Sequence, residues 1–287
     1  AVNNAVDELN DYMSDANKQE KDIKSGEWQS ATGTSFKALQ FSNGNIPFRI
    51  VCPTPMNTFV IYNLSTEEPM VAVQELKDFE GNYYKLCYTD TNSCSIRDCV
   101  VFDWKLHGFG SIPIVEFPNN HERLSDIEIT LLITDGINKL QSDRINGVEQ
   151  FVSAWIKFIN CEIDKDTFRE MRQEGALVVK SNNGAENKAD VDVMTKELNQ
   201  TEGQVVFDDL FERFLSIQGL ANRSNNNSGG DTGNAVNLRN GHYDAGLRTA
   251  INEPILKKSE RMSLKIILNR LRINKGFTLM PSDIVIH

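Results

Sequence analysis

The sequence predicts an α+β protein, and three observations indicate this fold class. Residues 1–118 contain short runs in which apolar and β-branched residues alternate or cluster, as they do in strands. A capping-box pattern, Ser125-Asp126-Ile127-Glu128, then begins the strongest helical periodicity in the chain. Two further helical segments follow, and the last of them contains Pro254. Strands and helices thus come in separate runs, which is typical of α+β proteins.

The first 118 residues are predicted to contain a helical start followed by a series of strands. The initial 24 residues are expected to be helical, because Val6, Leu9 and Met13 are spaced for one helix face. Turn sequences such as Glu80-Gly81-Asn82 and Asp90-Thr91-Asn92 then separate short apolar runs. These runs predict strands at residues 36–41, 48–51, 58–62, 70–76, 83–88, 95–104 and 114–117.

A long helix is predicted over residues 126–160. Its apolar residues recur at steps of three or four, and they are Ile133, Ile137, Leu140, Val148, Phe151 and Trp155. Such a helix exceeds the average globular helix several-fold in length. We expect it to cross between two parts of an assembly or to pack beside copies of itself.

A small inserted unit is predicted to follow the long helix, over residues 161–200. It would contain a short helix at 166–173 and strands at 176–180 and 191–194. A second amphipathic helix is predicted over 205–219, with an apolar side formed by Phe207, Leu210, Phe211, Phe214 and Leu215. Two helices that flank an insertion predict an antiparallel pair carrying a small head.

The last third of the chain is predicted to contain a polar loop and a helix. Residues 220–241 are too polar to bury apolar area, so a mobile loop is expected there. A helix is predicted over 242–273, interrupted and kinked at Pro254, because proline deletes one ladder hydrogen bond and clashes with the preceding turn. Residues 277–287 have strand character.

Length and charge restrict the possible functions. The chain has 287 residues and a net charge of −10, which allows one large domain or two to three small ones. The acid excess argues against a broad basic surface that grips duplex DNA, although not against a protein that handles DNA without gripping it. The charge is −7 over residues 1–125, −8 over 126–219 and +5 over 220–287. This distribution indicates surfaces that face different partners, or ordinary solvated surface.

The search for chemistry in the sequence predicts no enzyme, no metal site and no cofactor. The Gly-rich residues 228–233 are not followed by the Gly-Lys-Ser/Thr of a phosphate-binding loop and not preceded by an apolar strand, and the four histidines are scattered. The carboxylates of Glu67-Glu68 and Asp208-Asp209 are paired as sequence neighbours. Acid/base catalysis needs carboxylates that converge in a cleft, so a solvent-exposed face is the better interpretation of these pairs. Five cysteines without a CxxC unit fit neither a disulfide framework nor a zinc ribbon, and no apolar run spans a membrane.

Two stretches of sequence resemble a known family. One is Asn57–Tyr62, which follows Pro55 and has Phe59, Ile61 and Tyr62 in a strand. The other is His107–Asn120, with Gly110-Ser111-Ile112-Pro113-Ile114-Val115-Glu116-Phe117 at its centre, followed by Glu122–Glu128 at the start of the long helix. Together with the order of the elements over about residues 25–287, they resemble portal (connector) proteins of tailed double-stranded DNA bacteriophages. The similar branch is that of long-tailed phages and prophages of Gram-positive hosts.

The resemblance implies a division of the chain into named parts. Residues 1–124 would form most of a β-rich wing, and residues 125–160 and 204–219 a two-helix stem. Residues 161–203 would form a small α/β clip, residues 220–241 a tunnel loop, and residues 242–287 a long kinked helix with a strand that returns to the wing. The C-terminal crown of the family is expected to be absent from this chain.

The resemblance also implies partners and a location. Portal subunits form a homo-oligomeric ring, usually of about twelve copies, at one vertex of the capsid. Double-stranded DNA is packaged and ejected through the ring, which docks the large terminase and then the head–tail adaptor. Capsid and scaffold proteins are further partners, no membrane is involved, and the ring assembles in the host cytoplasm. Two other interpretations remain open, which are an adaptor or scaffold ring without a DNA channel and a carboxylate-dependent hydrolase.

Candidate site residues follow from the implied channel. Acidic residues on its wall would repel phosphates and keep the duplex centred, and the candidates are Glu202, Asp208, Asp209 and Glu212. Transient DNA contacts are expected from the tunnel loop, at Arg223, Asn225, Asn226, Asn227, Gly229, Gly230 and Arg239. Candidate subunit contacts are Phe151, Trp155, Phe211 and Phe214. Equally, the acids could form intersubunit salt bridges or face solvent, and the aromatic residues could belong to the core of one subunit.

Overall fold

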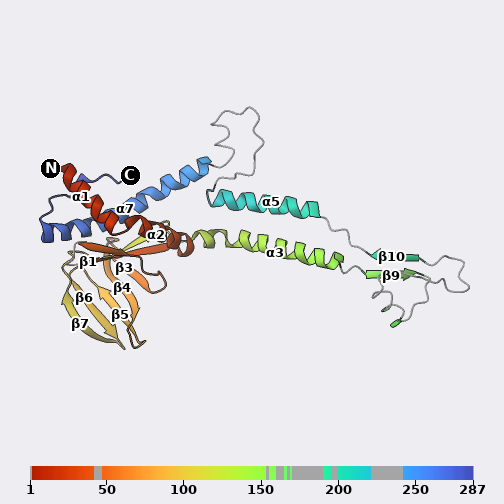
Figure 1. The fold of residues 1–287 in the computed structure, drawn as a ribbon, viewed down its shortest axis with the longest axis horizontal. Coiled ribbons are helices and arrows are strands. Elements are labelled where there is room, and N and C mark those ends of the chain that lie inside the picture. Colours follow the sequence, from red (N-terminus) through yellow and green to blue (C-terminus); the bar gives the residue numbers. More distant parts are fainter. Residues whose placement is uncertain are drawn as a thin grey trace, which may run out of the picture. The chain divides into compact units, whose positions relative to one another are not determined.

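The computed structural model describes residues 2–41, 47–152, 155–159, 165–166, 169, 190–194, 200–220 and 242–286. The chain divides into two compact units, each treated by itself below. The larger unit contains residues 1–131 and 215–287, and the smaller unit contains residues 132–214. Both combine helices with strands, which confirms the predicted α+β class (Figure 1).

The larger unit begins with two helices that lead into a three-stranded sheet. Helix α1 (Val2–Asp15) and helix α2 (Lys18–Thr32) confirm the predicted helical start and extend it by eight residues. The antiparallel sheet has the order β2-β1-β8, with β1 (Thr34–Phe41), β2 (Phe48–Val51) and β8 (Ile114–Pro118). Helix α2 ends at Gly33, whose φ of 80° and N–H bond to the Gln29 carbonyl form a left-handed cap.

A five-stranded antiparallel sheet forms the rest of the β structure of the larger unit. Its order follows the chain, as β3 (Thr58–Tyr62), β4 (Pro69–Lys77), β5 (Tyr83–Tyr88), β6 (Asn92–Arg97) and β7 (Val100–Leu106). The single strand predicted over residues 95–104 is wrong, because the chain reverses at Asp98 and Cys99, which both have positive φ. Neither is glycine or asparagine, so the usual signal of a two-residue hairpin turn is missing from the sequence.

The main core lies between helix α7 (His242–Lys275) and the three-stranded sheet. Leu268 and Leu271 are fully buried against residues such as Phe48 and Phe117, which are also fully buried. Each such side chain contributes about 1.5–3 kcal/mol by leaving water. A second cluster, formed by Phe36, Ala38, Ala72, Ile112 and Ile114, joins this sheet to the five-stranded one.

The end of the chain differs from the prediction in two ways. Helix α7 continues through Pro254 without interruption, and Figure 1 shows its two halves running in different directions, as expected of a proline kink. Residues 276–286 contain a short 3-10 helix (Pro281–Asp283) and no strand, so the strand predicted over 277–287 is wrong. Phe277 and Leu279 alternate as strand residues do, but they pack into the core beside α7 without pairing to a sheet edge.

A buried lysine connects three elements of this core. The Lys37 side chain on β1 is only 4% exposed, and its ammonium lies 2.6 Å from Asp22 on α2 and 2.6 Å from Glu260 on α7. The ammonium also lies 4.1 Å from the centre of the Phe117 ring. Because a buried charge is costly unless it is paired, these contacts fix the relative positions of α2, β1 and α7.

The smaller unit contains parts of two long helices and a two-stranded sheet. Helix α3 (Asp126–Val152) starts as predicted but ends earlier, and helix α5 (Gln200–Ile217) starts five residues before its predicted beginning. Strand β9 (Trp155–Ile159) pairs with β10 (Asp190–Met194), so the helix predicted through residue 160 is wrong at residues 155–159. Aromatic and β-branched residues dominate Trp155–Ile159, and they favour a strand over a helix. The strand predicted at 176–180 lies outside the described residues.

Two glycines of helix α2 and its cap provide a matched test of this fold. A Cβ on Gly33 would lie 2.0 Å from the Arg123 carbonyl oxygen, whereas a Cβ on Gly26 would meet no atom within 4 Å. Gly33→Ala is therefore expected to lower the free energy of unfolding by about 3 kcal/mol or more. Gly26→Ala is expected to raise it by about 0.5–1 kcal/mol, because alanine favours the helix. Urea unfolding of both variants measures the difference, and equal effects would contradict the close approach at Gly33.

Candidate functional site: an acidic helix face and a polar joint

One face of helix α5 carries four exposed carboxylates. They are the predicted wall residues Glu202, Asp208, Asp209 and Glu212, and their spacing of three, four and seven residues places them along one side of the helix. Arg213 is the one cation of this helix, and it lies 3.0 Å from Asp209, with both side chains more than half exposed. The Gln204 side chain donates to Asp208 at 2.7 Å. The face therefore remains strongly acidic, although Asp209 is partly neutralised.

The opposite side of α5 packs within the smaller unit. Leu210 lies against Gly136 of α3, where an added Cβ would be 3.8 Å from the leucine side chain, and Gly203 lies against Arg144. Arg144 also donates to Gln204 at 3.1 Å. These contacts show that α3 and α5 lie side by side in this unit (Figure 1).

Three phenylalanines form a ladder on α5. The rings of Phe207 and Phe211 are stacked with centres 5.9 Å apart, and those of Phe211 and Phe214 with centres 6.3 Å apart. Phe211 is 41% exposed, so the ladder is not fully covered by its own chain. The other two predicted contact residues do not share one helix face, because Phe151 is in the last turn of α3 and Trp155 is in β9.

The seven predicted tunnel-loop residues cannot be compared with the structure. Arg223, Asn225, Asn226, Asn227, Gly229, Gly230 and Arg239 all lie outside the described residues. Their roles stay predictions.

A polar joint, which the sequence did not reveal, lies at the start of α3 in the larger unit. The carboxylate of Asp126 accepts hydrogen bonds from Ser30 of α2 at 2.8 Å and from Asn119, which follows β8, at 2.9 Å. Arg248 of α7 donates to the same carboxylate and forms an ion pair with it. The Asp126 side chain is 17% exposed, so these donors replace most of its hydration.

Gln218 completes the joint from the end of α5. Its amide donates to the main-chain oxygen of Asp126 at 2.7 Å and to the Thr130 hydroxyl at 3.0 Å. Arg248 donates in turn to the main-chain oxygen of Gln218 and, at 3.3 Å, to its side-chain oxygen. The capping box beside it is confirmed, since the Glu128 N–H donates to the Ser125 hydroxyl at 2.9 Å and the Ser125 N–H to the Glu128 carboxylate at 3.4 Å.

The other polar and titratable groups of the described residues have mainly structural contacts. Within the described residues, no group of three or more His, Cys, Asp or Glu side chains is placed to hold a metal ion. His107 bonds through Nε2 to the Thr89 carbonyl at 2.7 Å and packs beside Tyr88 and Phe109, which is a structural role. Burial raises the pKa of Cys52, which opposes thiolate formation. No helix in the described part of the chain is long and apolar enough to cross a membrane.

The described residues thus offer an acidic helix face, a partly exposed aromatic ladder and a polar joint. The family model for phage portal proteins of the SPP1 Gp6-like type matches residues 1–285. The chain therefore belongs to the phage portal family, as its sequence motifs predicted, and is a phage portal subunit. A search of curated proteins found no match.

The joint can be tested with two glutamines that each form several hydrogen bonds. Gln218 is 8% exposed, whereas Gln204 is exposed on α5. Gln218→Ala is expected to lower the free energy of unfolding by about 1–3 kcal/mol, because it removes the hydrogen bonds of a buried amide to Asp126, Thr130 and Arg248. Gln204→Ala is expected to change it by less than about 0.5 kcal/mol. Thermal and urea unfolding measure both, and a Gln218→Ala variant as stable as the control would contradict the joint.

Proposed function

We propose that copies of this chain assemble into a ring of about twelve subunits at one capsid vertex, through which double-stranded DNA is packaged and ejected. The match to the phage portal family over residues 1–285 is the observation that carries this proposal. In it, residues 1–124 are most of the wing, α3 and α5 are the stem, residues 161–203 are the clip and residues 220–241 are the tunnel loop. The clip contacts the terminase during packaging and the head–tail adaptor afterwards, and assembly takes place in the host cytoplasm.

The acidic face of α5 supports a role on the channel wall. A DNA channel cannot bind tightly, because each phosphate contact made must be broken as the duplex advances. Glu202, Asp208 and Glu212 are exposed carboxylates on one helix face, and a ring repeats that face around its axis. Such a lining repels the backbone from every side and keeps the duplex near the centre. Cations of the tunnel loop, Arg223 and Arg239, then provide brief contacts.

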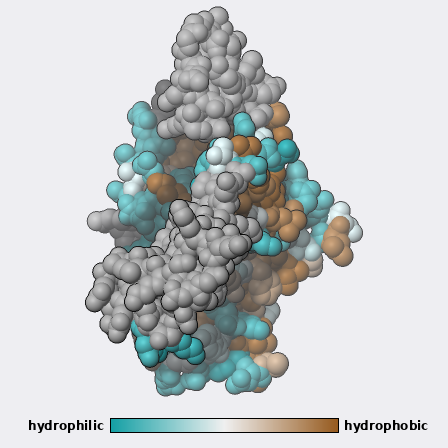
Figure 2. Space-filling view, turned by 90° about the vertical axis from the view of Figure 1, so that its right-hand side faces the viewer, coloured by the Kyte–Doolittle hydropathy of each residue, from teal (hydrophilic) through white to brown (hydrophobic). Residues whose placement is uncertain are grey.

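Exposed apolar side chains support the assembly. Ile145 on α3 is 61% exposed, and Val205 and Phe211 on α5 are 64% and 41% exposed. Figure 2 shows hydrophobic surface beside hydrophilic surface on the face that it presents. Apolar side chains grouped on long helices favour burial against neighbouring subunits. We assign the Phe207–Phe211–Phe214 ladder to that contact.

The assembly itself is tested by native mass spectrometry and negative-stain microscopy of the purified protein. We expect a closed ring of about a dozen copies with an axial hole. A monomer, or a compact oligomer without a hole, would refute the proposal. A ring whose hole is too narrow for duplex DNA would instead favour an adaptor without a DNA channel.

The channel role is tested by neutralising the acidic face. In rings that carry Glu202→Gln, Asp208→Asn and Glu212→Gln together, duplex DNA is expected to be retained about tenfold more strongly at low salt, since fewer charges repel the phosphates. The control carries Glu67→Gln, Glu68→Gln and Asp90→Asn, which remove equal charge from exposed turns of the five-stranded sheet. Retention of labelled duplex by purified rings measures the effect. Equal retention by both variants would contradict the placement of α5 on the channel wall.

A further inference from the structure

The turn between β4 and β5 presents a fully exposed aromatic side chain on a rigid support. Phe79 is 111% exposed, which is more than in an extended reference peptide. Asp78 accepts hydrogen bonds at its Oδ1 from the main-chain N–H of Glu80 at 3.0 Å and of Asn82 at 2.8 Å. Its other carboxylate oxygen lies 2.7 Å from Arg97 on β6. The turn is therefore pre-organised, and immobilising it in a contact costs little further entropy.

The chemistry of this turn combines an apolar group with acid. Glu80 follows Phe79 and is exposed, with only a 3.4 Å hydrogen bond from Asn82. Hydrogen bonds from the turn N–H groups, the Asn82 one first, lower the pKa of Asp78, so this carboxylate stays ionised. We call Phe79 and Glu80 the knob. A rigid aromatic residue beside a carboxylate fits a partner that is apolar in the middle and basic at its rim.

Helix α7 carries a surface with those properties. A shallow hollow of about 350 Å³ is lined by Pro254, Met262 and Pro281 and by the cations Lys258, Arg261 and Lys265. The three cations are exposed, and among the described residues none of them has a carboxylate partner. Their spacing of three, four and seven residues aligns them along one side of α7, whereas Leu264, Ile267 and Leu268 of the same helix are buried. We call this surface the basic hollow.

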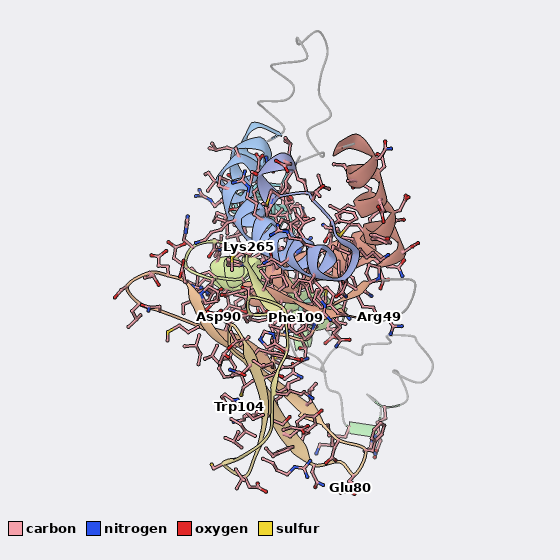
Figure 3. All side chains as sticks on the ribbon, turned by 90° about the vertical axis from the view of Figure 1, so that its left-hand side faces the viewer. Arg49, Glu80, Asp90, Trp104, Phe109 and Lys265 are labelled. Carbon is pink, nitrogen blue, oxygen red and sulfur yellow. The ribbon has the colours of Figure 1, made fainter. Side chains whose placement is uncertain are left out.

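The knob and the basic hollow cannot meet within one chain. Both belong to the larger unit, and Figure 3 shows Glu80 at one extreme of the view, well separated from Lys265. Two different complementary patches on one chain are what a closed ring requires, since each subunit offers one patch to each neighbour. The phenyl ring matches the prolines and methionine in the hollow, and it offers its face to the guanidinium of Arg261. The negative charge of Glu80 complements the positive charges of Lys258 and Lys265 in the basic hollow.

We propose that the knob of each subunit docks into the basic hollow of a second copy of this chain. The proposal rests on the proposed ring and assigns it a specific contact in addition to the α3 and α5 surfaces. Glu80 then pairs with Lys258 or Lys265 of the neighbouring copy, and Phe79 covers Met262. In the assembled ring, the contact also neutralises part of the positive charge of α7.

Charge exchange tests the docking. Glu80→Lys and Lys258→Glu are each expected to shift the balance from rings to free subunits by about tenfold, and the double variant to restore rings. Glu68→Lys is the control, because Glu68 is exposed on the neighbouring β3–β4 turn and the substitution changes the charge equally. Native mass spectrometry over a dilution series measures the balance, and circular dichroism checks that each variant is folded. Equal effects of Glu80→Lys and Glu68→Lys would overturn the proposal.

Disulfide trapping tests the pairing directly. Glu80→Cys and Arg261→Cys are combined in a chain with Cys99→Ser, because Cys99 is an exposed thiol. Mild oxidation with oxidised glutathione is expected to give a ladder of covalent multimers, and neither single cysteine variant should give one. If the wild-type protein forms rings but the double variant gives no ladder, the docking proposal is overturned and the proposed ring still stands. An absence of wild-type rings would refute the proposed function instead. If Glu80→Lys forms normal rings that do not enter capsids, while Glu68→Lys rings do enter them, the docking proposal is overturned and the knob binds a capsid protein instead.

Discussion

The carboxylate of Asp126 is shared by donors from three separate segments, and the main-chain oxygen of the same residue is held by a fourth. Ser30 and Asn119 come from the sheet side of the larger unit, Arg248 comes from α7, and Gln218 follows α5. Within the larger unit, the first turn of α3, the residue after α5 and helix α7 therefore meet at one partly buried negative charge. A buried carboxylate tolerates few arrangements of its donors, because each missing bond costs about 1–3 kcal/mol. The joint is consequently a specific connection, whereas the apolar core around Leu268 and Phe117 could tolerate small shifts.

The joint links the parts of the chain to which the proposed portal function assigns different work. Helices α3 and α5 carry the acidic face and the aromatic ladder, and α7 carries the basic hollow. Charge is separated accordingly, since α5 has four acids and one cation while α7 has eight cations and three acids. A weakly binding channel needs the first distribution, and contact with acidic surfaces of neighbouring copies needs the second. One chain can serve both purposes because the two charge distributions lie on different helices.

The local sequence pattern predicted most strands, the starts of α3 and α7 and the family, and it failed where tertiary contacts decide the structure. Strands β3 and β5 were predicted to the residue, and the capping box at Ser125 was confirmed. The apolar spacing of Phe151 and Trp155 suited either helix or strand, so the end of α3 was missed. The acids of α5 lie on one face, as a helical repeat predicts. Whether that face lines a channel depends on how the subunits assemble, which the sequence of one chain does not determine. The joint was invisible because Arg248 is 122 residues and Gln218 is 92 residues from Asp126, and no local pattern couples positions that far apart.

The central claim is that Asp126 and Arg248 act together to hold α3, α5 and α7. A double-mutant cycle measures this coupling, using Asp126→Ala, Arg248→Ala and the combined variant in urea unfolding. We expect each single substitution to destabilise the protein and the double variant to lose less than the sum, with a coupling energy of about 1–3 kcal/mol. Effects that add to within about 0.5 kcal/mol would show that the two residues act independently and would contradict the account.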